Sequence, residues 1–195
     1  MSRVAMAARQ TGETDITVRM DLDGSGKVDV STGVGFFDHM LSALGRHSLI
    51  DLTVRAKGDT WVDDHHTVED VGIVMGWVLR DALGDKSGIR RFGDALVPMD
   101  EALVMAAIDI SGRGELYWDV PIGAQKVGTF DTELAHEFFA GFARDAGITL
   151  HLREVAGDNA HHIIECTFKA CARALRAAVE PDPRVKGIPS TKGSL

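Results

Sequence analysis

Two copies of the motif His-His-x-x-Glu are the part of this sequence best suited to bind metal ions. If the motif begins a helix, its first histidine and its glutamate share a face and can chelate one ion. The second histidine points about 100° away and can serve another ion. Imidazole and carboxylate ligands suit manganese, iron, cobalt or zinc better than calcium or magnesium. The six candidate ligands are His65, His66, Glu69, His161, His162 and Glu165.

A single copy of the motif has a simpler explanation, because a polar helix start with a capping glutamate has the same composition. Helix capping gives no reason for paired histidines to occur twice, so the duplication favours metal binding. His39 stands at the expected start of another helix. Alone, it is more typical of a core or capping histidine. Beside a metal cluster it becomes a further candidate ligand.

Four cations in or beside glycine-bearing segments, and a fifth at Lys169, could bind a phosphate group together with nearby serine hydroxyls. Taken singly, each is more often a solvated surface cation. Only grouping in space would make them a site, and the sequence does not show that grouping. The five are Arg90, Arg91, Arg113, Lys169 and Lys192.

The two motifs lie in an internal duplication, which predicts two similar halves. The second motif follows the first by 96 residues in a chain of 195. Downstream, Leu79-Arg80 and Ala82 recur at the same offset as Leu175-Arg176 and Ala178. Upstream, the match continues after a small change in length. We therefore expect one repeat over residues 1–88 and a second over residues 89–195, together forming one compact domain.

Periodicity predicts the same order of elements in each half. A strand at 16–22 ends in a turn at 23–26, and residues 27–31 could form its hairpin partner. Helices are expected at 37–46 and 68–83, with a strand at 49–56 between them. In the second half we expect strands at 102–111 and 149–155 and helices at 134–146 and 163–179. This pattern predicts an α+β fold of mainly antiparallel sheets with helices on one face of each.

Composition excludes several classes of protein. The net charge of −8 argues against a general nucleic-acid binder, although a local basic pocket remains compatible with it. No apolar run is long enough for a membrane span, and the first ten residues lack the apolar region of a signal peptide. Cys166 and Cys171 fall in a helical pattern and are expected to be buried thiols rather than a disulfide. A cytoplasmic location is the simplest expectation.

Beyond these inferences, the sequence resembles the imidazoleglycerol-phosphate dehydratase family of histidine biosynthesis over nearly its whole length. No phosphatase domain is attached, as in the monofunctional form. The resemblance implies a duplicated α+β unit with two four-stranded sheets and four helices packed between them, like the second domain of ribosomal protein S5. The matching segments are residues 9–14, 37–41, 63–70, 88–93, 99–102, 109–113, 159–165 and 189–193.

The resemblance also implies two Mn²⁺ ions per active site and a homo-oligomer, an octahedral 24-mer of trimers with sites at subunit interfaces. Many members carry a histidine just before the Phe-Phe pair of the second half. Here Glu137 holds that position, with His136 one residue earlier as the doubtful alternative. The implied ligands are His39, His65, His66, Glu69, Glu137, His161, His162 and Glu165.

Two ligand sets follow as an inference from the duplication. His65 and Glu69 would chelate one ion, and His161 and Glu165 the other. The second histidine of each motif would cross to the opposite ion. His39 and Glu137 would complete the two sets.

The implied reaction removes water from imidazole glycerol phosphate and gives imidazole acetol phosphate. Two metal ions could bind the ring as imidazolate, which would help to expel the neighbouring hydroxyl. Glu13, on an N-terminal segment expected to be flexible, is the candidate acid/base. The ligands Glu69, Glu165, His66 and His162 are the other residues expected to take part in catalysis. Those implied for substrate binding are Glu13, Arg91, Arg113, Lys169, Ser190 and Lys192, with Arg90 a less favoured neighbour.

Two other functions use the same metal cluster. A two-metal hydrolase of a phosphorylated small molecule would release phosphate or another fragment, whereas a dehydratase releases only water. A metal-storage or metal-stapled oligomer would need the cluster but neither Glu13 nor the cations. No membrane or nucleic-acid partner is expected for any of these functions.

Overall fold

The computed structural model describes residues 3–195 and contains two four-stranded sheets with the same strand order. The first sheet has the order β1-β2-β4-β3, and the second has the order β5-β6-β10-β7. In each sheet three strands are antiparallel and the last one pairs in parallel. The strands are β1 (Val4–Gln10), β2 (Thr14–Asp21), β3 (Val28–Ser31), β4 (Asp51–Gly58), β5 (Phe92–Met99), β6 (Ala102–Asp109), β7 (Glu115–Asp119) and β10 (Thr149–Ala156).

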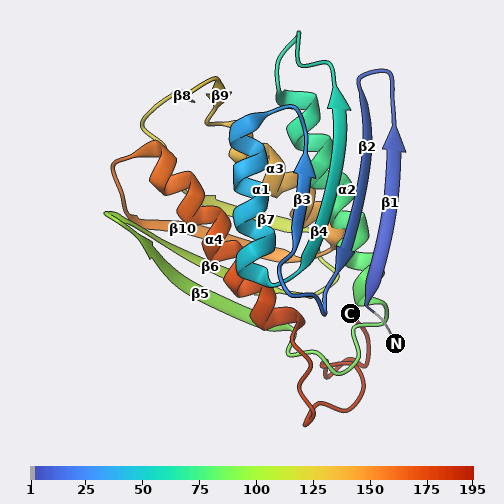
Figure 1. Cartoon of the computed structure of the whole chain (residues 1–195). Helices are drawn as coiled ribbons and strands as arrows, with labels where there is room; N and C mark the ends of the chain where they lie inside the picture. Colours follow the sequence, from blue (N-terminus) through green and yellow to red (C-terminus); the bar gives the residue numbers. More distant parts are fainter. Residues whose placement is uncertain (1–2) are drawn as a thin grey trace.

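Four helices lie between the two sheets, as Figure 1 shows. Helix α2 packs on β1, β2 and β4, and α4 packs on β5 and β6. Each of these helices also contacts a helix of the other half, because α3 packs on α2 and α1 packs on α4. The helices are α1 (Gly35–Ser48), α2 (His65–Leu83), α3 (Leu134–Ala146) and α4 (Ala160–Val179), and a small hairpin of β8 (Lys126–Val127) and β9 (Phe130–Asp131) precedes α3.

The α+β class, the two sheets and the four helices confirm the predicted fold. Alternating burial explains why the strands form: Ile16, Val18 and Met20 of β2 are buried, and the residues between them face outward.

Cys166 and Cys171 are buried free thiols, as expected, and burial raises the pKa of Cys171 to about 12. Within residues 3–195, none of the helices has the length and apolar character needed to cross a bilayer. The repeat boundary between residues 88 and 89 stays a prediction.

The predicted hairpin of residues 16–22 with 27–31 is wrong. Strand β3 pairs in parallel with β4, and β2 instead lies between β1 and β4. The reason is that α1 connects β3 to β4, and a strand that returns through a helix lies parallel to its neighbour. The outer strands β1, β5 and β7 had no sequence prediction, because their alternating residues are only half-buried and give a weak apolar pattern.

Helices α2 and α3 approach each other so closely that only glycine fits at their contact. A Cβ atom on Gly72 would lie 2.5 Å from the carbonyl oxygen of Phe138, and one on Gly76 would lie 2.7 Å from the amide nitrogen of Ala146. Beside this contact, the rings of Phe138 and Phe139 pack on Phe168 of α4, with centroids 5.1 and 4.6 Å away. The backbone contact therefore joins the two halves at the centre of the core.

We expect Gly72→Ala to lower the free energy of unfolding by about 1–3 kcal/mol, because the new methyl group meets a backbone oxygen that cannot rotate away. Alanine favours a helix over glycine by about 1 kcal/mol, so the clash must outweigh a gain in propensity. Gly35→Ala is the matched control, since α1 begins there with no atom within 4 Å of the new Cβ. Chemical denaturation of both variants measures the difference in their free energies of unfolding. Equal stabilities would show that α2 and α3 can move apart to accommodate the methyl group.

Candidate functional site

The second His-His-x-x-Glu motif forms the first turns of α4. The side chain of Asn159 caps this helix by accepting hydrogen bonds from the backbone N–H groups of His161 and His162, at 2.9 and 3.3 Å. The cap fixes the first turn, so His161 and Glu165 share one face and His162 lies on another. The predicted start of a helix at this motif is therefore confirmed.

Helix α1 adds a third side chain to this face of α4. The Nε2 atoms of His39 and His161 lie 3.2 and 3.1 Å from the same Oε2 atom of Glu165. Within residues 3–195, this is the only group in which three such ligand atoms lie within 4.8 Å of one another. Two imidazoles and one carboxylate that converge in this way match the donors of a transition-metal site.

The carboxylate at the centre of this group is buried and ionised. Glu165 is 7% exposed, and its Oε1 atom lies 2.6 Å from Nζ of Lys169. Burial acts to raise the pKa of Glu165, but hydrogen bonds from Lys169 and His39 outweigh it and hold that pKa below its usual value. We call His39, His161 and Glu165 the metal-ligand group. Lys169 therefore lies beside this group and not among the other predicted phosphate-binding cations.

The first motif begins α2 and forms a looser pair. His65 Nε2 lies 3.6 Å from Glu69 Oε2, and the backbone N–H of His65 donates to Asp63. By position, Glu137 on α3 corresponds to His39 on α1, since both lie twelve residues before the strand that follows the helix. In this structure Glu137 instead accepts from His136 Nδ1 at 2.9 Å.

Among residues 3–195, no group of three ligand atoms within 4.8 Å of one another joins His136 or Glu137 to the motif on α2. The ring of His136 meets the Trp118 ring edge-on, at 5.6 Å between centroids. The choice of Glu137 over His136 as a ligand stays a prediction.

The second histidine of each motif contacts acidic residues on both ring nitrogens. His66 Nδ1 lies 3.0 Å from Asp59, and its Nε2 lies 3.8 Å from Glu13. His162 Nδ1 lies 2.7 Å from Glu101, and its Nε2 lies 3.7 Å from Asp100.

These hydrogen bonds change the acidity of the groups that share them. The bond to Asp59 raises the pKa of His66, and the bond to Glu101 raises that of His162. The bond to His162 and the backbone N–H of Asn159 lower the pKa of Glu101 to about 2. Sequence reasoning missed Asp59 and Glu101, because both lie in turns whose position relative to the helices only the fold reveals.

Glu13 lies in the tight turn between β1 and β2, and not on a free N-terminal segment as expected. Thr11 Oγ1 accepts from the backbone N–H groups of Glu13 and Thr14, at 3.1 and 3.0 Å. Asp70 of α2 anchors both strands at this turn, since it accepts from Thr14 Oγ1 at 2.5 Å and pairs with Arg9. The turn thus presents Glu13 beside the first turn of α2.

A separate pocket of about 350 Å³ collects four of the predicted substrate-binding residues, Arg91, Arg113, Ser190 and Lys192. Asp109 holds two of them in place, with 2.7 Å to Arg91 Nε and 3.4 Å to an amino group of Arg113. Ser111, Thr191, Ser194 and Leu195 complete the lining. We call this the anion pocket. Arg90 does not line it and pairs with Glu180 at 3.3 Å.

The anion pocket and the metal-ligand group lie at opposite ends of α4. The backbone N–H of Arg91 donates to the carbonyl of Ala178, near the end of the helix, whereas His161 lies in its first turn. A helix rises 1.5 Å per residue, so about 25 Å separates the two ends. One chain therefore does not bring these two sets of residues together.

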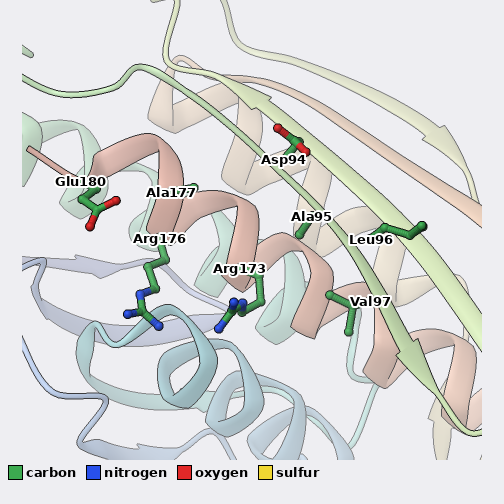
Figure 2. Close-up of a pocket in the computed structure, with 8 residues that line it drawn as sticks. All are labelled: Asp94, Ala95, Leu96, Val97, Arg173, Arg176, Ala177 and Glu180. Atoms are coloured by element: carbon green, nitrogen blue, oxygen red, sulfur yellow. The ribbon is translucent and has the colours of Figure 1, made fainter. Parts of the chain in front are cut away.

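A groove of about 390 Å³ between β5 and α4 contains none of the predicted site residues (Figure 2). The side chains of Arg173 and Arg176 lie next to each other there and point away from β5. Its remaining lining is Asp94, Ala95, Leu96, Val97, Ala177 and Glu180.

Comparison with known proteins identifies close relatives. The model of the imidazoleglycerol-phosphate dehydratase family matches residues 32–175. The chain is 61% identical to the imidazoleglycerol-phosphate dehydratase of Acidiphilium cryptum, over the full length of both, and 62% identical to that of Paracoccus denitrificans, over 99% of this chain and 100% of the relative.

Solved structures show the same similarity. The crystal structure of imidazoleglycerol-phosphate dehydratase from Staphylococcus aureus superposes with a TM-score of 0.84 at 38% identity, covering 92% of this chain and 99% of that one. The enzyme of that name from Pyrococcus furiosus also gives a TM-score of 0.84 at 38% identity, covering 97% of this chain and 100% of that one.

We expect Glu165→Gln to weaken Mn²⁺ binding by more than about 100-fold. The amide keeps the shape of the side chain but removes the negative charge that contacts His39, His161 and Lys169. Substituting even a residue that only contacts a ligand typically weakens metal binding by about 10–100-fold. Isothermal titration of metal-stripped protein measures the change. Glu180→Gln, just beyond the other end of α4, is the matched control. Unchanged Mn²⁺ affinity in Glu165→Gln would show that Glu165 is not a metal ligand.

Proposed function

The chain belongs to the imidazoleglycerol-phosphate dehydratase family, and we propose that its two histidine motifs and its anion pocket together carry out that family's reaction. The protein is therefore a lyase of histidine biosynthesis, which removes water from imidazole glycerol phosphate and forms imidazole acetol phosphate. The convergence of His39 and His161 on Glu165 is the observation that best supports this mechanism, because it pairs ligands from both halves of the duplicated chain.

The donor atoms fit manganese. Imidazole nitrogens with carboxylate oxygens are the ligands of Mn, Fe, Co and Zn sites, and the buried Glu165 already carries the negative charge that a cation needs. We assign two Mn²⁺ ions per complete site, with His39, His161 and Glu165 at one and His65 and Glu69 at the other. His66, His162 and Glu137 would complete the two sets. Bound metal would supply Lewis acidity and a template for the imidazole ring.

Glu13 is a better candidate for the acid/base than the buried ligand Glu165. Glu165 is surrounded by Lys169, His39 and His161, and these contacts stabilise its ionised form and make it a weak base. Glu13 is half-exposed, and the one ion pair that its side chain forms among residues 3–195 is with His66, at 3.8 Å. A carboxylate beside a ring-holding histidine can take a proton from the substrate and deliver one to the leaving hydroxyl.

The anion pocket would hold the phosphate group. Arg91 and Arg113 offer forked guanidinium groups and Lys192 a point charge, with Ser190 as an additional hydroxyl donor. Asp109 aligns the two arginines side by side. Fixing the phosphate orients the substrate so that its reacting carbons meet the acid/base in one geometry.

A complete site must combine residues of different copies of the chain. The substrate has only three carbons between its ring and its phosphate, far too few to span the roughly 25 Å between the two ends of α4. We therefore propose active sites at subunit interfaces, in the 24-subunit assembly of trimers expected from the family. The free buried thiols suit a cytoplasmic enzyme. A two-metal hydrolase is not favoured, because the relatives and the solved structure named above are dehydratases.

The activity test uses Mn²⁺-loaded protein and imidazole glycerol phosphate, with the enolizable ketone product followed directly. We expect Glu13→Gln to lower turnover by about 100- to 10,000-fold, because the amide cannot accept a proton. Metal content and substrate affinity should stay as in the wild type. Asp15→Asn, two residues further on the same hairpin, is the control. A Glu13→Gln protein with nearly full turnover would transfer the role to a metal-bound carboxylate such as Glu69.

Mixed assembly tests whether sites are shared between chains. His161→Ala and Arg91→Ala should each be inactive alone, the first through loss of a metal ligand and the second through loss of the phosphate clamp. Dissociating the two proteins, mixing them and reassembling them should restore part of the activity, because some interfaces then combine two intact sets of residues. Mixing without dissociation is the control. No recovery in properly reassembled mixtures would mean that each site is built from one chain.

A further inference from the structure

Two carboxylates outside the predicted ligand sets touch equivalent atoms of the two motifs. Asp59 lies 3.0 Å from Nδ1 of His66, and Glu101 lies 2.7 Å from Nδ1 of His162. His66 and His162 are the second histidines of the two motif copies. The same ring nitrogen is therefore engaged on both sides of the duplication.

The two carboxylates are not themselves counterparts in the duplication. Asp59 follows β4 in the segment Gly58-Asp59, and the matching segment in the second half is Gly157-Asp158. The partner of His162 is nevertheless Glu101, in the turn between β5 and β6. Each half thus uses a residue from a different element for one contact. This difference indicates that the histidine ring requires a carboxylate at Nδ1, because the contact was not simply inherited from the duplicated sequence.

Both carboxylates are held firmly enough to orient a ring. The side chain of Asp59 is only 10% exposed. The second oxygen of Glu101 accepts from the backbone N–H of Asn159 at 2.9 Å, and Asn159 is the residue that caps α4. Glu101 therefore ties the β5–β6 turn to the first turn of α4 and to the His162 ring together.

A carboxylate on Nδ1 determines which nitrogen can bind a metal. It favours the tautomer with hydrogen on Nδ1, leaves the lone pair on Nε2, and increases the basicity of that nitrogen. The Nε2 atoms of His66 and His162 are also the ones that face Glu13 and Asp100, at 3.8 and 3.7 Å. On the His66 side, this neighbour is Glu13, the acid/base of the proposed reaction.

We propose that Asp59 and Glu101 are positioning residues that fix His66 and His162 to bind metal through Nε2. This inference rests on the proposed function, since it assumes that both histidines are ligands. It adds that the ligand nitrogen is the same in the two halves, and that residues from unrelated positions keep it so.

The test measures metal binding rather than activity. Metal-stripped wild type, Glu101→Gln, Glu101→Ala, Asp59→Asn and Asp59→Ala are titrated with Co²⁺, whose visible spectrum reports affinity and ligand geometry, and with Mn²⁺ by calorimetry. We expect each alanine variant to bind one ion about 10–100-fold more weakly, with a changed Co²⁺ spectrum. The amide variants should lie between alanine and wild type, because a carbonyl oxygen still accepts from Nδ1–H but carries no charge.

Asp158→Asn is the matched control, because Asp158 is the sequence counterpart of Asp59 and has no contact with a histidine among the hydrogen bonds of residues 3–195. Its Co²⁺ and Mn²⁺ affinities should stay within about twofold of wild type. Circular dichroism and gel filtration check that each variant folds and assembles. Wild-type protein without a Co²⁺ or Mn²⁺ site would overturn the proposed function. Wild-type affinity and spectrum in both alanine variants would overturn the positioning role alone.

Discussion

The packing of α1 from the first half against α4 from the second is the contact on which the metal-ligand group depends. It carries His39 to the same oxygen of Glu165 that His161 approaches. Neither half could bury its helices alone, because each sheet has one covered face and the helices lie between the two sheets. The hydrophobic core and the metal-ligand group therefore form through the same association of the halves. This association also explains why the contact between α2 and α3 requires glycine.

Much of this fold could be predicted from the sequence. The four helices have apolar positions at helical spacing, and the paired histidines at the start of two of them pointed to metal before any geometry was known. The partner of β3 could not be predicted, because a short strand with half-buried side chains has no preference for one neighbour until α1 fixes its direction. The local sequence pattern indicates which residues are buried. The pairing of strands depends instead on the segments that connect them.

The candidate site divides in the same way. Ligands within one motif follow from helix geometry, so His161 and Glu165 were predicted together. His39 could only be suspected, since its place beside Glu165 depends on packing between residues 126 positions apart. Asp59 and Glu101 left no signal, because acidic residues in turns are common and nothing local connects Glu101 with a histidine 61 residues away. Arg90 and Arg91 look alike in sequence, and only the fold sends Arg91 into the anion pocket and Arg90 towards Glu180.

The length of α4 has a consequence for how activity would scale with the amount of protein. If the two ends of this helix serve different sites, a solitary chain contains no complete site. Catalysis would then have a reaction order above one in chain concentration wherever the assembly begins to dissociate. Strong dilution would reduce the rate per chain without unfolding any chain, and substrate that bridges two copies would oppose this loss. The activity per chain would therefore increase with the concentration of the enzyme.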